Sequence, residues 1–186
     1  MSIQLAKRLL TVSEYHKMTE VGILDEDDRI ELINGEIIEM SPIGSLHTSH
    51  VKRIMRLFHR LSTGDEFLVS VQDPIQLGRH SEPQPDLALL RYQEDFYEKK
   101  HPQPEDIILV VEVADSSIGY DREVKRPLFA SVDIQEFWIV NLEAGQVEVY
   151  KKPVNGDYAS RQDFKRGDTI FIESLDFAVK VDKVLG

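Results

Sequence analysis

Two acidic residues stand at the ends of apolar segments that are typical of neighbouring β-strands. Residues 107–113 are apolar except for Glu112, which is the pattern of a strand buried on both faces of a sheet. A buried carboxylate is costly unless it is paired, hydrogen-bonded or bound to a cation. Asp86 directly precedes a second apolar run, Leu87–Leu90. If the two strands pair antiparallel, the start of one lies beside the end of the other, and Asp86 and Glu112 share one edge of the sheet.

This pair of carboxylates predicts a Mg²⁺ site, because Mg²⁺ binds through one or two carboxylates and keeps several of its waters. Lys125 lies near the start of the helix expected after Glu112. Its ammonium could hold an attacking water or neutralise charge on a phosphate in the transition state. Simpler interpretations also exist: a structural ion pair for Glu112, a strand-entry residue for Asp86 and a solvated helix face for Lys125.

The elements that must position these residues mix helices and strands. Thr11 and Glu14 have the spacing of a capping box, which predicts a helix from about Val12 to Val21. Asn34-Gly35, between residues 29–33 and 36–40, predicts a hairpin because both residues tolerate positive φ. Helices are expected over 46–61 and 121–132, and further strands over 67–71, 75–77, 87–90, 107–113, 136–140, 146–150, 158–164 and 169–172. The expected class is α+β, or mixed α/β, with a sheet covered by two helices.

Composition narrows the classes of protein. The 186 residues are expected to form one domain, 1–186. The chain has no cysteine, which excludes thiolate zinc sites, thiol nucleophiles and disulfides and favours a reducing compartment. No apolar run approaches the length of a membrane span, so a cytoplasmic protein without membrane contact is expected. The net charge of −11 disfavours strong non-specific binding of nucleic acid, but a local basic groove is compatible with it.

The helix expected over 46–61 adds two weaker features. Lys52, Arg56 and Arg60 share one face and could contact phosphates, although such a stripe is usually a solvated face. His47 and His50 lie three residues apart, but no third histidine or cysteine follows at metal-site spacing, so a histidine metal site is not expected. A phosphate-cradling glycine loop and a Gly-x-Ser-x-Gly elbow are both missing from the sequence, which leaves no support for a nucleotide-triphosphate or serine-hydrolase function.

The order of the motifs resembles the Uma-type branch of the PD-(D/E)XK nuclease superfamily. The resemblance covers roughly residues 11–150, and each motif by itself is short. The motifs are Thr11-x-x-Glu14-Tyr15, Glu31-Leu32-Ile33-Asn34-Gly35-Glu36, Met40-Ser41-Pro42, Pro85-Asp86, Val111-Glu112-Val113, Asp121 with Lys125, and Glu136-Phe137-Trp138-Ile139-Val140.

The resemblance implies a restriction-endonuclease-like core, a mixed β-sheet flanked by helices with extra β-hairpins, and cleavage of DNA that depends on Mg²⁺ or Mn²⁺. Asp86 and Glu112 match the metal-binding acids, and Glu31 matches an additional acid before the hairpin turn. The motif expects lysine two positions after the second acid, where this chain has Ala114. Lys125 is therefore identified as the displaced catalytic lysine.

Alternatives to this assignment stay open at the level of sequence. Glu31 could be an exposed strand residue paired with Arg29, and Asp121 could be only a helix cap. A homodimer is expected by analogy, because a cut through two strands needs two sites. The rival to a DNA endonuclease is a binding or assembly protein that keeps the fold without catalysis; the acidic charge and Ala114 favour it.

Overall fold

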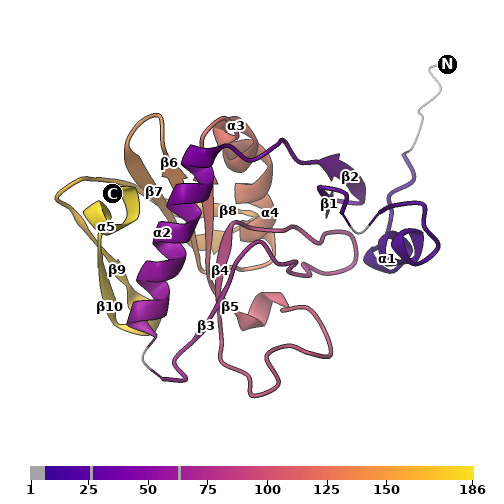
Figure 1. Cartoon of the computed structure of the whole chain (residues 1–186), viewed down its shortest axis with the longest axis horizontal. Coiled ribbons are helices and arrows are strands. Elements are labelled where there is room, and N and C mark those ends of the chain that lie inside the picture. Colours follow the sequence, from indigo (N-terminus) through magenta and orange to yellow (C-terminus); the bar gives the residue numbers. More distant parts are fainter. Residues whose placement is uncertain (1–6, 26, 63) are drawn as a thin grey trace.

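A six-stranded mixed sheet forms the centre of the molecule (Figure 1). The structure is a computed structural model that describes residues 7–25, 27–62 and 64–186. Within the sheet only β5 and β6 run parallel, and the other neighbours are antiparallel. The strands, in their order across the sheet, are β3 (Leu68–Ser70), β4 (Leu87–Leu90), β5 (Ile107–Ala114), β6 (Glu136–Asn141), β7 (Gln146–Val154) and β8 (Asp157–Lys165).

Helices and two small hairpins surround this sheet. The hairpins pair β1 (Ile30–Ile33) with β2 (Glu36–Glu39) and β9 (Thr169–Ile172) with β10 (Phe177–Lys180). The helices are α1 (Val12–Glu20), α2 (Ser45–Leu61), α3 (Ile118–Tyr120), the π-helix η2 (Asp121–Lys125), α4 (Arg126–Ser131) and α5 (Val181–Leu185), with short 3₁₀ turns at Pro104–Asp106 and Glu173–Leu175.

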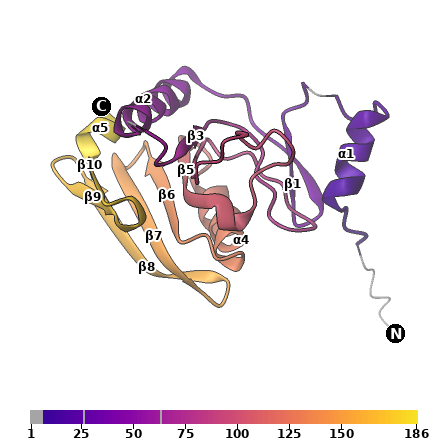
Figure 2. The ribbon, with the colours of Figure 1, turned by 90° about the horizontal axis from the view of Figure 1, so that it is seen from below.

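Alternate residues of β5 pack against different helices on the two faces of the sheet. Val111 and Val113 belong to a core cluster with α2 and α5, whereas Val110 and Ala114 belong to a cluster with α4. Figure 2 shows α2 and α4 on opposite sides of the strands. Glu112 shares the phase of Val110 and Ala114 because side chains alternate along a strand, and it therefore faces the side of α4. This is the expected α+β fold with a mixed sheet between helices.

The N-terminal elements follow their local sequence signals. Thr11 and Glu14 form the expected capping box: the Glu14 backbone N–H donates to Thr11 Oγ1 at 3.2 Å, and the Thr11 N–H donates to Glu14 Oε2 at 2.9 Å. Asn34 and Gly35 turn the β1–β2 hairpin with φ values of 51° and 79°. Helix α1 and this hairpin project to one side of the six-stranded sheet (Figure 1).

The helix expected over 121–132 is present but interrupted. It begins at Ile118 and is wound as a π-helix over Asp121–Lys125 before α4 starts. Pro127 explains the change, since proline has no N–H to donate and its ring collides with the carbonyl four residues earlier. The Arg126 N–H accordingly donates to Asp121 O, five residues back. Asp121 thus lies inside the helical segment, after α3 has ended, and its interpretation as the N-terminal cap of this helix was wrong.

Two further differences from the expected elements concern the segment 75–77 and the C-terminus. Ile75 and Leu77 are buried but belong to no strand, because their N–H groups bond to Pro83 O and Ser81 O within a tight reversal of the chain. Strand β10 and helix α5, which the sequence did not reveal, follow β9. In the ranges that the structure covers, no helix has both the length and the apolar character needed to cross a membrane.

Gly35 is required by both its conformation and its surroundings. A Cβ at this position would lie 2.6 Å from Leu9 Cβ, because residues 9–10 pass over the turn. Gly35→Ala is expected to lower the free energy of unfolding by about 1–2 kcal/mol for the left-handed conformation plus about 1–3 kcal/mol for overpacking. Gly78→Ala is a matched control, since Gly78 has a φ of +81° with nothing within 4 Å of the added Cβ. Urea denaturation of both variants measures the difference, and equal losses would contradict the close approach.

Candidate active site

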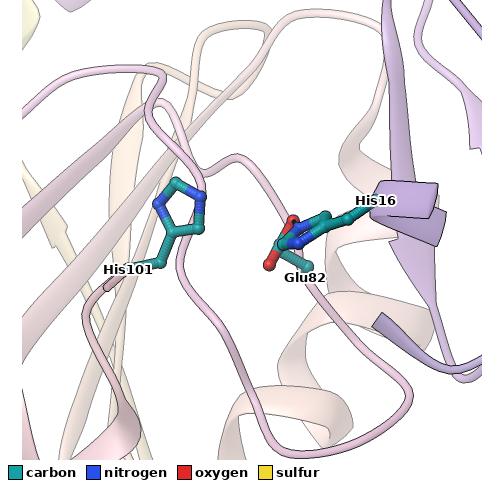
Figure 3. Close-up of side chains that lie close together, drawn as sticks. All are labelled: His16, Glu82 and His101. Carbon is teal, nitrogen blue, oxygen red and sulfur yellow. Dashed lines mark hydrogen bonds and ion pairs between the residues drawn. The ribbon is translucent and has the colours of Figure 1, made fainter. Parts of the chain in front are cut away.

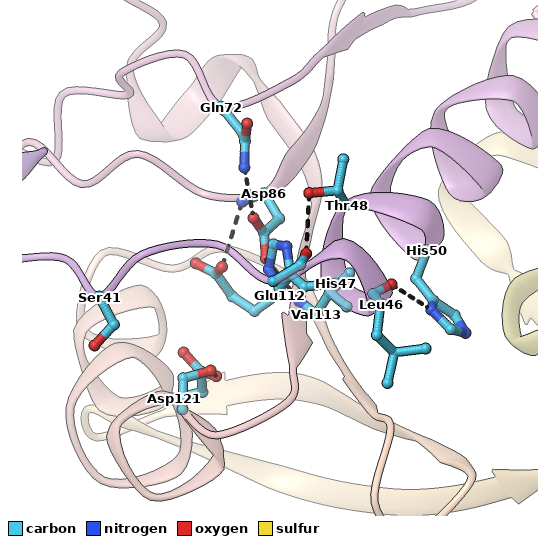
Figure 4. A network of polar contacts seen from close by, with 12 residues as sticks. Ser41, Leu46, His47, Thr48, His50, Gln72, Asp86, Glu112, Val113 and Asp121 are labelled. Atoms are coloured by element: carbon cyan, nitrogen blue, oxygen red, sulfur yellow. Dashed lines mark hydrogen bonds and ion pairs between the residues drawn. The ribbon is translucent and has the colours of Figure 1, made fainter. Parts of the chain in front are cut away.

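Asp86 and Glu112 lie side by side at one edge of the central sheet. Strand β4 pairs antiparallel with β5, and Leu87 stands opposite Val111. The backbone N–H of Asp86 donates to Glu112 Oε2 at 3.3 Å, and the N–H of Val113 donates to Asp86 Oδ2 at 2.9 Å. Figure 4 shows the Glu112 carboxylate turned toward the backbone of Asp86. The antiparallel register thus produces the juxtaposition expected from the sequence.

Lys125 reaches this pair of acids from the π-helix η2. Its ammonium donates to Glu112 Oε1 at 2.8 Å and lies 3.5 Å from Glu31 Oε2. The Lys125 side chain is only 7% exposed, so it does not belong to a solvated helix face. The π-helical turn carries Lys125 over the end of β5, where the ammonium reaches the acid despite the absence of a lysine at Ala114.

Glu31 is buried in the same site. Its side chain is 1% exposed, and it accepts hydrogen bonds from the Gln84 N–H at 3.2 Å and from the Tyr120 hydroxyl at 3.2 Å. Arg29 donates instead to the carbonyl of Ser41. The interpretation of Glu31 as an exposed residue paired with Arg29 was therefore wrong.

Two side chains that the sequence did not assign to the site also contact Asp86. His47 Nε2 lies 2.8 Å from Asp86 Oδ2, and Gln72 Nε2 donates to Asp86 Oδ1 at 3.1 Å (Figure 4). His50 turns away, with its Nε2 3.2 Å from Leu185 O, so the two histidines of α2 do not converge on one ion. The position of His47 in the first turn of α2 gave no signal for this contact, since Asp86 is far away in the chain.

The surroundings set the charges of the site. Burial alone raises the pKa of Asp86, but the hydrogen bonds from His47, Val113 and Gln72 lower it below its usual value. Burial raises the pKa of Glu112 well above its usual value; Lys125 opposes this shift, and the nearby carboxylates reinforce it. Burial also raises the pKa of Asp121 to about 6, partly offset by Lys125. For Lys125, attraction to Glu112 and other carboxylates outweighs burial and raises the pKa.

These groups line a pocket of about 710 Å³. Glu31, Asp86, Glu112 and Asp121 contribute carboxyl groups to its inner part, next to the Lys125 ammonium. Four further acids and one arginine also line the pocket: Asp27, Asp28, Glu39, Asp115 and Arg29. Hard oxygen donors and an excess of negative charge are what a divalent cation such as Mg²⁺ requires. Burial and the neighbouring carboxylates raise the pKa values of Glu112 and Asp121, and Lys125 offsets only part of that shift. The residues present therefore fit a carboxylate-bound metal ion, with Glu112 bonded to the backbone N–H of Asp86.

The fold and the pocket define a nuclease-like class of protein, and comparisons with known proteins agree. Residues 12–182 match the Uma2 family, described as "Putative restriction endonuclease", and the chain belongs to this family. A solved structure of similar fold is that of "a putative nuclease belonging to DUF820 from Anabaena variabilis ATCC 29413", with a TM-score of 0.73, 13% identity, and coverage of 95% of this chain and 97% of that chain. No functionally curated protein matches the chain.

Asp121 makes the stability of the protein depend on pH. Its folded pKa of about 6 lies above the reference value of 3.8, so the folded state binds a proton more tightly than the unfolded state. Stability from this group is fully present below about pH 4 and is lost as the pH rises through 6, by on the order of 3 kcal/mol. We expect the free energy of unfolding of Asp121→Asn, relative to that of the wild type, to increase as the pH rises from 4 to 7. Urea denaturation without divalent ions measures both free energies.

Ser117→Ala serves as the control for this measurement. The Ser117 hydroxyl donates to Asp121 Oδ2 at 2.7 Å, so its removal alters a hydrogen bond but keeps the carboxylate and the pH dependence. A constant difference between Asp121→Asn and the wild type at every pH would contradict the raised pKa.

Proposed function

We propose that the protein is a metal-dependent endonuclease that hydrolyses phosphodiester bonds of DNA. The observation that carries the proposal is the contact of Asp86 with Glu112 in a buried pocket where Lys125 bonds to Glu112. Membership of a restriction endonuclease family supports the same activity. The site is assigned to Asp86, Glu112, Lys125 and Glu31.

Each residue has a distinct role in this proposal. Asp86 and Glu112 hold a Mg²⁺ or Mn²⁺ ion, which when bound supplies positive charge that stabilises the transition state of the phosphate. Lys125 holds the attacking water or neutralises charge on the phosphate through its ammonium. Glu31, 3.5 Å from that ammonium, keeps it charged and in place.

His47 and Tyr120 act as positioning residues. The hydrogen bond between His47 Nε2 and Asp86 fixes the orientation of a metal-binding carboxylate, as a hydrogen-bond partner of a metal ligand commonly does. The Tyr120 hydroxyl fixes Glu31, and the Lys125 ammonium lies 5.9 Å from the centre of the Tyr120 ring. These contacts leave Lys125 little freedom to leave the pocket.

Helix α2 supports DNA as the substrate despite the net charge of −11. Gly44 and His47, at its N-terminal end, line the pocket, and the N-terminus of a helix favours anions. Lys52, Arg56 and Arg60 are exposed further along the helix. A DNA backbone that enters the pocket along α2 would meet positive charge on a surface that is otherwise acidic.

A homodimer is part of the proposal because each pocket contains the residues for cutting one strand. Two paired sites would linearise a plasmid in one binding event, whereas a single site would produce nicked circles first. The form of the product in the assay below therefore reports on the assembly.

Substitution of either metal-binding acid is expected to abolish most of the activity. Asp86→Asn and Glu112→Gln keep the shapes of the side chains but remove the charges that hold the cation. We expect each to reduce plasmid cleavage in Mg²⁺ or Mn²⁺ at least about 100-fold, the size of effect seen when one transition-state stabiliser is lost. Initial rates of supercoil loss measure the effect.

Glu143→Gln is the matched control, because Glu143 is an exposed acid in the turn between β6 and β7. Its rate should equal that of the wild type. Equal cleavage by the wild type and both acid variants would reveal a contaminating nuclease. Absence of cleavage by a wild-type protein that binds DNA would favour the non-catalytic binding protein.

The basic stripe of α2 predicts a salt effect on DNA binding. Replacement of Lys52, Arg56 and Arg60 by alanine should weaken binding uniformly across DNA sequences, because phosphate contacts carry no sequence information. The slope of log affinity against log salt should fall by up to about 0.9 for each lost phosphate contact. Fluorescence anisotropy with a short duplex measures both quantities.

A variant with alanine at Lys99, Lys100 and Lys152 controls for the loss of three positive charges, since these lysines are exposed outside α2. Equal salt slopes for the two triple variants would show that the α2 stripe is only a solvated face.

A further inference from the structure

A second group of metal-ligating side chains lies outside the candidate active site. His16 of α1, Glu82 of the segment before β4 and His101 of the loop between β4 and β5 each offer one ligand atom, and these atoms all lie within 4.8 Å of one another. The two imidazoles approach Glu82 from different sides (Figure 3). None of the three residues lines the active-site pocket, so the group forms a separate cluster, the His16–Glu82–His101 cluster.

One oxygen of the Glu82 carboxylate is buried without a hydrogen-bond partner. Its side chain is only 3% exposed, and Oε1 lies 2.7 Å from His16 Nε2. The other oxygen, Oε2, is buried without any hydrogen bond. A buried acceptor without a donor costs free energy, and such atoms are rare in native proteins. An ion bound to this carboxylate would remove that cost.

The backbone around Glu82 holds the unpaired oxygen in place. The Glu82 N–H donates to Leu32 O at 2.7 Å, and the Leu32 N–H bonds back to Glu82 O at 3.4 Å. Glu82 is thus bridged to strand β1, and its carboxylate is directed into the protein next to α1.

The two histidines are presented by segments that are also fixed. Helix α1 is capped by Thr11 and Glu14, and the Val12 N–H at its start donates to Arg79 O. The carbonyl of His101 accepts a bond from Gln103 Nε2 at 3.0 Å. The His16 side chain is 43% exposed, and the ring centroids of the histidines are 6.1 Å apart. Both segments are held in place. Rotation of the exposed His16 ring can bring its nitrogen, within 4.8 Å of the other two ligand atoms, to the distance at which all three bind one ion.

We propose that His16, Glu82 and His101 bind a Zn²⁺ ion. Two imidazole nitrogens and one carboxylate oxygen are a donor set that zinc accepts, at about 2.0–2.2 Å from the metal, with the fourth position open to water. Imidazole nitrogen favours zinc over Mg²⁺, which prefers oxygen ligands. The two clusters would therefore take different metals: oxygen donors at Asp86 and Glu112, and mixed nitrogen and oxygen donors here.

A zinc ion in this cluster would fasten together three segments that are distant in the chain. Glu82 lies four residues before Asp86, and Gln84 between them donates to Glu31 of the active site. The ion would thus stabilise α1 and the loop after β4 against the segment that carries Asp86. The site is structural in this proposal and does not depend on nuclease activity.

Zinc binding is best tested in an Asp86→Asn background, which weakens binding of metal at the active site. Equilibrium dialysis with metal analysis should find one Zn²⁺ per chain. In the same background His16→Ala, Glu82→Gln and His101→Ala should each weaken zinc binding at least about 100-fold, since loss of even a hydrogen-bond partner of a metal ligand costs about 10–100-fold. His59→Ala, at an exposed histidine of α2, should leave zinc binding unchanged.

The thermal midpoint gives an independent readout. Zn²⁺ should raise it in the Asp86→Asn protein and in its His59→Ala derivative, and should leave it unchanged when a ligand is replaced. Circular dichroism establishes that each variant is folded. If Glu82→Gln destabilises the fold, His16→Ala and His101→Ala still test the site. Failure of the Asp86→Asn protein to bind zinc, or zinc binding that persists in His16→Ala and His101→Ala, would overturn the proposal.

Discussion

The buried ion pair between Lys125 and Glu112 is the interaction on which the site depends. Both side chains are almost completely buried, and the ammonium lies 2.8 Å from the carboxylate. Burial of two charges is repaid only when the geometry is good and further bonds satisfy the remaining atoms. Here Glu31 and the backbone of Asp86 supply those bonds. The pair thereby connects β5, the π-helical turn and the β1–β2 hairpin. Removal of Lys125 would leave Glu112 and Glu31 buried without an opposite charge, at a cost of about 3–5 kcal/mol.

A second buried glutamate shows what distinguishes this site from a structural ion pair. Glu148 is fully buried, and burial alone would raise its pKa. Bonds from Arg122, Asn141 and Tyr150 lower the pKa to about 2 instead. Glu148 is thus completely compensated by the protein. Glu112 shares one lysine with other carboxylates, and its pKa remains raised. The same type of residue has a lowered pKa in one place and a raised pKa in the other. The carboxylates that gather around Lys125 in the pocket support the cation site proposed at Glu112.

The carboxylates gathered in the pocket also relate stability to function. A set of carboxylates that repel one another destabilises the folded protein, and the cation proposed for this site would recover that free energy on binding. The pocket is built from rigid elements: the ends of two paired strands, a hairpin with a fixed turn and a π-helix set by Pro127. Preorganised ligands of this kind bind a cation without a large loss of conformational entropy.

The sequence alone determined those features that depend on short-range rules. The capping box of α1, the Asn34-Gly35 turn and the strand periods follow from local geometry. The contact of Asp86 with Glu112 was also predictable, because antiparallel pairing of two recognisable strands places one start beside one end. The fold class follows from the same patterns, and the family resemblance rests on the order of the short motifs along the chain.

Only the tertiary structure decided which distant side chains complete the site. The sequence could not show that a π-helical turn would carry Lys125 to Glu112, that Glu31 would be buried, or that His47 would reach Asp86. His16 and His101 lie far apart in the chain, and no spacing rule could join them to Glu82. Local patterns set the direction of a side chain relative to its own element, whereas its neighbours depend on how the elements pack, and that packing is fixed by the whole core at once.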